Sequence, residues 1–153
     1  MRRKKKIKIR QANLEDIPQI LAIEGSAWGS ERSASQKMFE SRIKTYPEGV
    51  LVAEDNGKLV GVVVIERVNY DLEKDAFTWY EITDNGFIKN THKPDGDTVY
   101  GVDLSVAASH QNLGIGSKLL ENIGKIAIKC NLKRGLLGGR IPGYHKYASK
   151  MGV

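Results

Sequence analysis

Apolar residues first alternate with basic ones and then recur at helical spacing. The alternation predicts a short half-buried strand over residues 7–10. Asn13 is a predicted helix N-cap, because Asp16 stands three positions later and apolar residues then recur on one helical face. A second helix is predicted from Ser35 to Pro47, since proline disfavours helix in the residue before it. We expect both helices to cover one side of a sheet.

A β-hairpin is predicted over the next two apolar runs. Residues 50–53 and 59–65 are rich in β-branched side chains and are separated by a turn that contains Asn56 and Gly57. Asn-Gly favours a hairpin turn because both residues tolerate positive φ.

Residues 70–96 are an elaborated connection with no clear period. Residues 77–82 suit a strand, but residues 84–86 and 93–96 have the composition of turns. Long connections in compact domains are often functional, so this segment is a candidate substrate lid.

The last third of the chain predicts a strand, a helix and a further strand. Residues 99–106 alternate, the helical stripe runs from Gly114 to about Lys129, and residues 134–138 suit a short strand. The mixture of strands and helices predicts an α/β (α+β) fold, with one domain over residues 7–153 behind a basic tail at residues 1–6. Strict alternation places two sets on opposite faces: Tyr100, Val102, Leu104 and Val106 on one, and Gly101, Asp103 and Ser105 on the other.

Composition narrows the class of protein. The chain has 153 residues, and its longest strongly apolar stretch, residues 59–65, is far shorter than the roughly 20 residues that a membrane helix needs. We therefore expect no membrane association. Cys130 is the one cysteine, which excludes an intrachain disulfide and a multi-cysteine zinc site. A reducing cytoplasm and no bound metal are expected.

Charge is concentrated at the N-terminus. The net charge is +6, and residues 2–6 supply five of these charges, so the rest of the chain carries +1. No basic helix or aromatic platform supports a nucleic-acid role, which we do not favour.

A glycine-rich turn between the predicted strand and helix carries the chemistry. Glycines let consecutive N–H groups turn toward one point, and a helix N-terminus adds partial positive charge there, so a diphosphate would fit. Neither the P-loop pattern nor the dinucleotide pattern Gly-x-Gly-x-x-Gly matches. The turn comprises Gln111, Asn112, Leu113, Gly114, Ile115, Gly116, Ser117 and Lys118.

The pattern that does match is Gln/Arg-x-x-Gly-x-Gly/Ala, with Gln111, Gly114 and Gly116 in its defining positions. Here the chain resembles the GNAT family of N-acetyltransferases, and the order of predicted elements is also that of the family. The resemblance implies a mixed, mostly antiparallel sheet flanked by helices. It also implies acetyl-CoA as acyl donor and a small-molecule or protein amine as acceptor.

By this resemblance, backbone groups of Leu104 and Val106 would pair with the pantetheine arm. The N–H groups from Gln111 to Ser117 would hold the pyrophosphate, with Lys118 adding charge at the rim.

Catalytic residues are also implied by the resemblance. A tyrosine after the fifth strand commonly protonates the departing thiolate, which points to Tyr147 and, with a poorer offset, to Tyr144. The position that aligns with the usual base on the fourth strand holds Tyr100, so Asp103 on the neighbouring face is the candidate acid-base residue. His110 and His145 are not favoured, since lone histidines are usually surface residues.

The family normally continues into a final strand pair, which this sequence lacks after the tyrosine segment. We therefore expect an open sheet edge and homo-oligomeric association. The alternative to an active N-acetyltransferase is a catalytically impaired CoA-binding module with a regulatory or interaction role.

Overall fold

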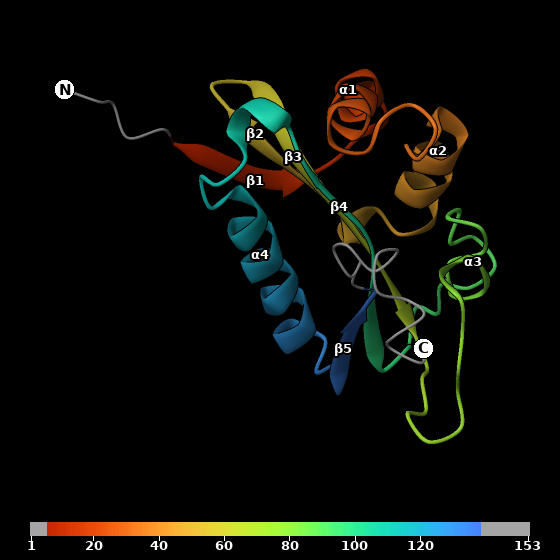
Figure 1. Cartoon of the computed structure of the whole chain (residues 1–153). Helices are drawn as coiled ribbons and strands as arrows, with labels where there is room; N and C mark the ends of the chain where they lie inside the picture. Colours follow the sequence, from red (N-terminus) through yellow and green to blue (C-terminus); the bar gives the residue numbers. More distant parts are fainter. Residues whose placement is uncertain (1–5, 139–153) are drawn as a thin grey trace, which may run out of the picture.

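The computed structural model describes residues 6–138. Five strands form one sheet in the order β1-β2-β3-β4-β5; neighbours pair antiparallel except β5, which is parallel to β4 (Figure 1). Helices flank this mixed, mostly antiparallel sheet, which confirms the predicted fold class. The strands are β1 (Ile7–Gln11), β2 (Val50–Asp55), β3 (Lys58–Val68), β4 (Thr98–Val106) and β5 (Arg134–Leu137).

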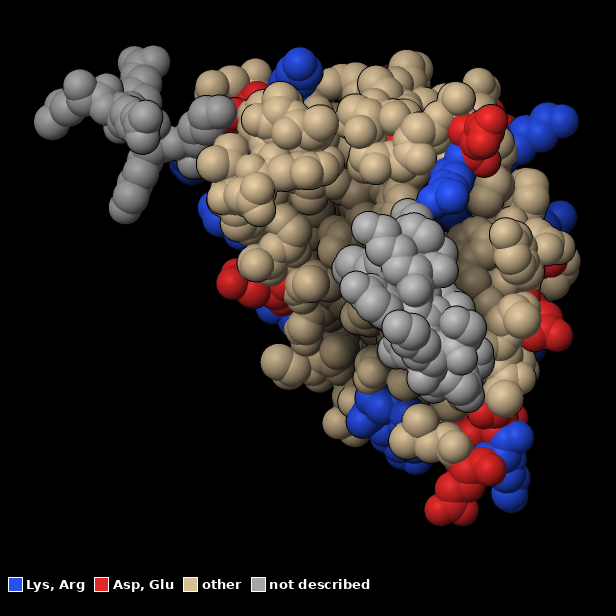
Figure 2. All heavy atoms as spheres, viewed as in Figure 1, with Lys and Arg blue, Asp and Glu red and all other residues tan. Residues whose placement is uncertain are grey.

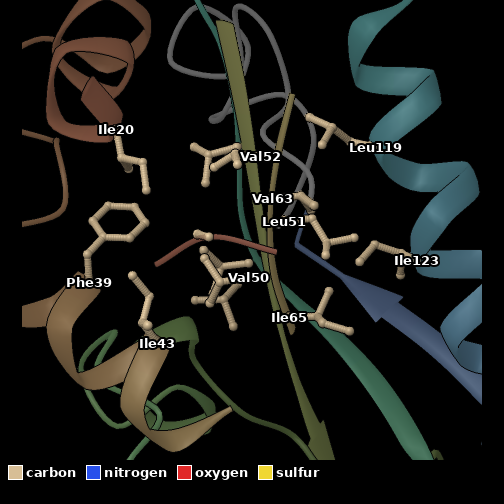
Figure 3. Packing of buried hydrophobic residues seen from close by; sticks show 14 of the residues in the cluster. Ile20, Phe39, Ile43, Val50, Leu51, Val52, Val63, Ile65, Leu119 and Ile123 are labelled. Atoms are coloured by element: carbon tan, nitrogen blue, oxygen red, sulfur yellow. The ribbon is translucent and has the colours of Figure 1, made fainter. Parts of the chain in front are cut away.

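The main helices cover the two faces of the sheet. They are α1 (Ile17–Trp28), α2 (Gln36–Thr45) and α4 (Ile115–Lys129). A short helix, α3 (Trp79–Ile82), lies in the connection between β3 and β4. Helices α1 and α2 lie on one face and α4 on the other (Figure 1). Figure 3 shows Phe39 packed from the α2 side and Leu119 from the α4 side, and both are fully buried. None of the helices in residues 6–138 is long and apolar enough to span a membrane.

Side-chain caps begin both N-terminal helical segments where they were predicted. Asn13 and Asp16 form a capping box, although the turn that it begins is a 3-10 turn that leads directly into α1. Ser35 caps α2 by accepting a hydrogen bond from the Met38 amide at 3.2 Å. These caps satisfy N–H groups that helices leave free.

The predicted hairpin is formed by β2 and β3. Asn56 and Gly57 have φ values of 51° and 80°, the left-handed conformation that their side chains tolerate. Strand β3 is longer than the predicted residues 59–65 and extends to Val68. Its length brings β3 alongside the whole of β4, where the site lies.

The connection between β3 and β4 contains a helix where a strand was considered. The Thr78 hydroxyl accepts from the Glu81 amide at 3.2 Å, and the Glu81 carboxylate accepts from the Thr78 amide at 2.7 Å. This capping box favours the helix α3, so part of the elaborated connection is helical rather than the strand that residues 77–82 also allowed. The turn at residues 84–86 has positive φ throughout, as its composition predicted.

A bulge in β4 changes which side chains share a face. The register with β3 shifts by one residue at Val102, whose carbonyl accepts a hydrogen bond from the Trp79 indole at 3.0 Å. Tyr100 and Asp103 pair with β3 residues two positions apart, and such residues share a face. The strict alternation predicted for residues 99–106, which placed Tyr100 opposite Asp103, was therefore wrong.

Candidate active site

The turn before α4 presents unpaired backbone amides. Gly114, with φ of 80°, caps the helix without a side-chain acceptor, and Asn112 has φ of 62°. The Lys118 amide makes the first helical hydrogen bond, to the Gly114 carbonyl at 3.1 Å. Within residues 6–138, the amides of residues 115–117 have no hydrogen-bond acceptor. Three free N–H groups at a helix N-terminus are suited to bind an anion.

This turn is held in place by its neighbours. The Gln111 side-chain amide donates to the Val106 carbonyl at 3.3 Å, and His110 Nε2 lies 3.0 Å from an oxygen of Asp55 at the end of β2. Ile115 is buried against the sheet, whereas Leu113 is exposed. The free amides are thus fixed in position before any ligand binds, which reduces the entropy cost of binding.

Within residues 6–138, strand β5 pairs only with the first half of β4. They pair from Thr98 with Arg134 to Gly101 with Leu137. Among the residues that the structure describes, no strand pairs with the second half of β4 on that side. Leu104 and Val106 lie on this open half, which leads directly to the amides of the turn. Figure 2 shows a recess in this side of the molecule, between the α4 layer and the α1 and α2 layer.

A polar cluster lies on the α1 and α2 side of β4. The Ser105 hydroxyl is 2.8 Å from Glu24 Oε1 and 3.3 Å from Asp103 Oδ1, and it accepts a hydrogen bond from the Trp28 indole at 2.7 Å. Arg42 Nη1 donates to Asp103 Oδ2 at 3.3 Å. We call these residues the carboxylate cluster: Glu24, Trp28, Arg42, Asp103 and Ser105.

Arg42 is the fixed counter-ion of the carboxylate cluster. Its side chain is 1% exposed, its Nε donates to the Gly86 carbonyl at 2.7 Å, and its guanidinium lies 4.7 Å from the centre of the Phe39 ring. Burial lowers the pKa of Arg42, while the negative charges of Asp103 and Glu24 act in the opposite direction. Arg42 therefore orients Asp103 and balances its charge.

Glu24 has the most displaced pKa in the carboxylate cluster. Burial, together with the hydrogen bond and charge interaction with Asp103, raises the pKa of Glu24 to about 8. Hydrogen bonds from Ser105 and the Ala34 amide act against this shift. Because a carboxyl group with this pKa changes protonation near neutral pH, the cluster has the property expected of an acid-base site.

The predicted catalytic residues have different outcomes. Asp103 lies in the carboxylate cluster, where its side chain is 10% exposed and so remains partly accessible. Tyr144, Tyr147 and His145 lie outside the described residues, and their roles stay predictions. His110 pairs with Asp55 at the end of β2, and the expectation that it has no catalytic role stays a prediction.

Sequence analysis missed Glu24 and Arg42. Both stand on the apolar stripes of their helices: Glu24 follows the buried Ile20 at helical spacing, and Arg42 lies between Phe39 and Tyr46. A charged residue on a buried stripe is rare unless it is paired, so these positions were a usable signal.

A separate cavity of about 590 Å³ lies beside the C-terminal half of α4. Its lining includes Arg67, His92, Lys129 and Cys130, and none of the residues of the turn or of the carboxylate cluster. The active-site assignment therefore follows the free amides and the open strand edge rather than this cavity.

Known proteins are similar to this chain in sequence and in fold. The acetyltransferase (GNAT) family profile matches residues 14–140. The uncharacterized N-acetyltransferase YkwB of Bacillus subtilis (strain 168) is 42% identical over 117 residues, which are 76% of this chain and 51% of YkwB. The probable hydrolase YhcX of the same organism is 35% identical over 147 residues, 96% of this chain and 28% of YhcX. The chain thus spans about half, or less, of these relatives.

Two solved structures show the same fold with a coenzyme A thioester bound. The GNAT-like decarboxylase GphF in complex with isobutyryl-CoA has a TM-score of 0.79 at 22% identity, covering 95% of this chain and 72% of GphF. A GNAT acetyltransferase from Brucella melitensis in complex with acetyl-CoA has a TM-score of 0.60 at 18% identity, covering 93% of this chain and 81% of that protein. Both bound ligands are coenzyme A thioesters, which agrees with acetyl-CoA as the expected donor. With its fold, its amide-lined turn and the profile match over residues 14–140, the chain belongs to the acetyltransferase (GNAT) family.

Proposed function

We propose that this chain is an N-acetyltransferase that moves the acetyl group of acetyl-CoA to an amine. One arrangement carries the proposal. The open half of β4 leads at its end to the free amides of residues 115–117, and its α1 and α2 face bears the carboxylate cluster. A donor and an acceptor can therefore meet along the same strand.

The donor would lie along the open half of β4. Backbone groups of Leu104 and Val106 would hydrogen-bond the pantetheine arm, and amides from Gln111 to Ser117 would hold the diphosphate. Lys118 is exposed at the rim, where its charge would add to that of the helix N-terminus.

The acceptor would approach the carboxylate cluster. Glu24 and Asp103 lie around Arg42, the one cation of this cluster within residues 6–138, and Glu24, with its pKa raised to about 8, gains negative charge as the pH rises. The cluster then favours a positively charged ligand over a negatively charged one. Decarboxylation, the activity named for GphF, would bring a substrate carboxylate toward these same groups. The cluster therefore favours an amine acceptor.

The reaction needs only alignment and proton transfers. The neutral amine attacks the thioester carbonyl carbon, so a C–N bond forms while the C–S bond breaks, and the thiolate leaves with a proton. Asp103 would accept a proton from the amine. Tyr147, or alternatively Tyr144, stays the predicted proton donor to the thiolate.

A pair of glycines in α4 tests the donor site. A Cβ at Gly116 would meet only Val106 at 3.9 Å, and a Cβ at Gly124 would meet nothing within 4 Å, so both accept aspartate sterically. Gly116→Asp places a carboxylate among the free amides, and we expect its affinity for acetyl-CoA in calorimetry to fall about 100-fold. Gly124→Asp, roughly two turns or more away from these amides, is the matched control and keeps wild-type affinity.

Turnover is tested by thiol release from acetyl-CoA with a panel of amines. Thiol release that depends on an amine supports the N-acetyltransferase. Acetyl-CoA binding without thiol release supports the alternative, a catalytically impaired CoA-binding module. Equal binding by Gly116→Asp and wild type would contradict the donor site itself.

The wider assembly is also a proposal, because the chain spans only part of its relatives. We expect association through a sheet edge, and light scattering at micromolar concentration is the measurement. A monomer would contradict this expectation without affecting the donor site.

A further inference from the structure

Two carboxyl groups from distant parts of the chain share one serine hydroxyl. Ser105 Oγ lies within hydrogen-bond distance of both Glu24 and Asp103, and one of its two acceptor lone pairs is used by Trp28. A hydroxyl has a single proton, so it can donate to only one of these carboxyl groups at a time. A proton held between the two acids relieves their repulsion.

The two acids differ in their access to solvent. Glu24 is 1% exposed, whereas the side chain of Asp103 is 10% exposed. A ligand can therefore touch Asp103, but it reaches Glu24 only through Asp103 and Ser105. Any role of Glu24 in turnover is indirect.

The groups that face Glu24 come from three directions. From β4 come Asp103 and Ser105, from α2 comes the charge of Arg42, and from the connection between α1 and α2 comes the Ala34 amide, which donates to Glu24 Oε2 at 3.3 Å. Within residues 6–138, Arg42 is the one cation of this cluster, and it is already bonded to Asp103 and to a backbone carbonyl.

We propose that Glu24 is a positioning residue for the acetyl transfer, which takes up, through Asp103 and Ser105, the proton that an ammonium acceptor must lose. The inference rests on the proposed function and narrows its substrate class. The preferred acceptor is an aliphatic primary amine, which is an ammonium ion at neutral pH, rather than an aromatic amine, which is already neutral.

The proton balance of this step is complete. The ammonium gives one proton to the carboxylate pair, and its freed electron pair forms the C–N bond as the C–S bond breaks. The thiolate takes the second nitrogen proton. The products are the amide, the free thiol and one proton, which passes from the pair to solvent.

The electrostatics support this assignment. Burial and Asp103 raise the pKa of Glu24 to about 8, so the group is protonated below that pH and able to accept a proton above it. With an aliphatic amine, kcat/KM should rise with pH and show an inflection near pH 8. Such an inflection would not follow from a purely structural role of Glu24.

The kinetic test compares two buried acids and two acceptors. Glu66 is the control, because it is fully buried and bonded to Thr91 at 2.7 Å but lies outside the carboxylate cluster. With benzylamine, Glu24→Gln should lower kcat/KM about 100-fold at pH 8.5 and remove the inflection. With aniline it should change kcat/KM less than about threefold. Glu66→Gln should keep the inflection with both acceptors.

A second measurement does not depend on turnover. The ¹³C shift of the Glu24 side-chain carboxyl, followed by NMR in the wild-type protein, should titrate near pH 8. A Glu24 titration close to 4.5, or an unchanged inflection in Glu24→Gln, overturns the inference and leaves the proposed function standing. Absence of thiol release from the wild type with every amine overturns the proposed function and, with it, this inference.

Discussion

The donor half and the acceptor half of the site are built in different ways. The proposed donor half is a continuous turn of free backbone amides whose conformation is fixed by Gly114 and Asn112. The acceptor half is made of side chains from α1, α2 and β4 that meet only in the folded protein. The donor half is exposed, whereas most of the acceptor half is buried.

This difference separates binding from stability. Most side-chain substitutions leave the backbone amides of the turn in position. Changes in the turn should therefore alter ligand affinity more than the free energy of unfolding. The carboxylate cluster is part of the interior, so its removal leaves buried charges unpaired. Four changes test this contrast, in order of decreasing effect.

Arg42→Leu should destabilise the fold most. It leaves Asp103 without its counter-ion and the Gly86 carbonyl without its donor, and we expect a loss of about 4 kcal/mol in unfolding free energy. Urea unfolding measures it. Lys118→Leu, which removes an exposed cation from the donor half, should cost less than about 0.5 kcal/mol. Similar losses of unfolding free energy in both variants would contradict the proposed difference between the buried acceptor half and the exposed donor half.

Stability should fall as the pH rises. Because the folded-state pKa of Glu24 is raised from 4.5 to about 8, its contribution is complete below about pH 4.5 and is lost as the pH rises through about 8. Glu66, raised to about 7, acts in the same direction. Urea unfolding between pH 5 and 9 should show a decrease of about 3 kcal/mol, smaller in Glu24→Gln. A flat profile would contradict the assigned burial.

The two tryptophans form a matched pair. Trp28 donates to Ser105 in the carboxylate cluster, and Trp79 donates to the Val102 carbonyl in the bulge of β4. Each change to phenylalanine should cost about 1 kcal/mol of stability for its lost hydrogen bond. Only Trp28→Phe should also shift the inflection of the pH profile of kcat/KM. A shift in both variants would show that the bulge of β4 also affects the ionisation that the pH profile of kcat/KM reports.

Lys118→Ala should have the smallest effect. Lys118 is exposed, and the amides of residues 115–117 supply the main contacts, so the Kd for acetyl-CoA should rise about threefold at low salt. Calorimetry at two ionic strengths should show the difference shrink as salt increases. A loss as large as that of Gly116→Asp would mean that the lysine, rather than the backbone, holds the diphosphate.

Much of the architecture was predictable because its determinants are local. The caps at Asn13 and Ser35, the Asn56 and Gly57 turn, and the stripe of α4 each act within a few residues. The alternation predicted for residues 99–106 was wrong for a tertiary reason. It follows from local pattern, whereas the bulge at Val102 depends on the pairing of β4 with β3.

Within the candidate site, the sequence by itself determined the donor turn, because glycine at position 114 and the helix that follows it suffice to free and aim consecutive amides. Only the tertiary structure decided the acceptor half. Glu24, Arg42 and Asp103 are far apart along the chain, and none of them belongs to a spacing that marks a site. Packing α1 and α2 onto the face of β4 brings them together, and the same burial raises the pKa of Glu24 into the range of acid-base chemistry.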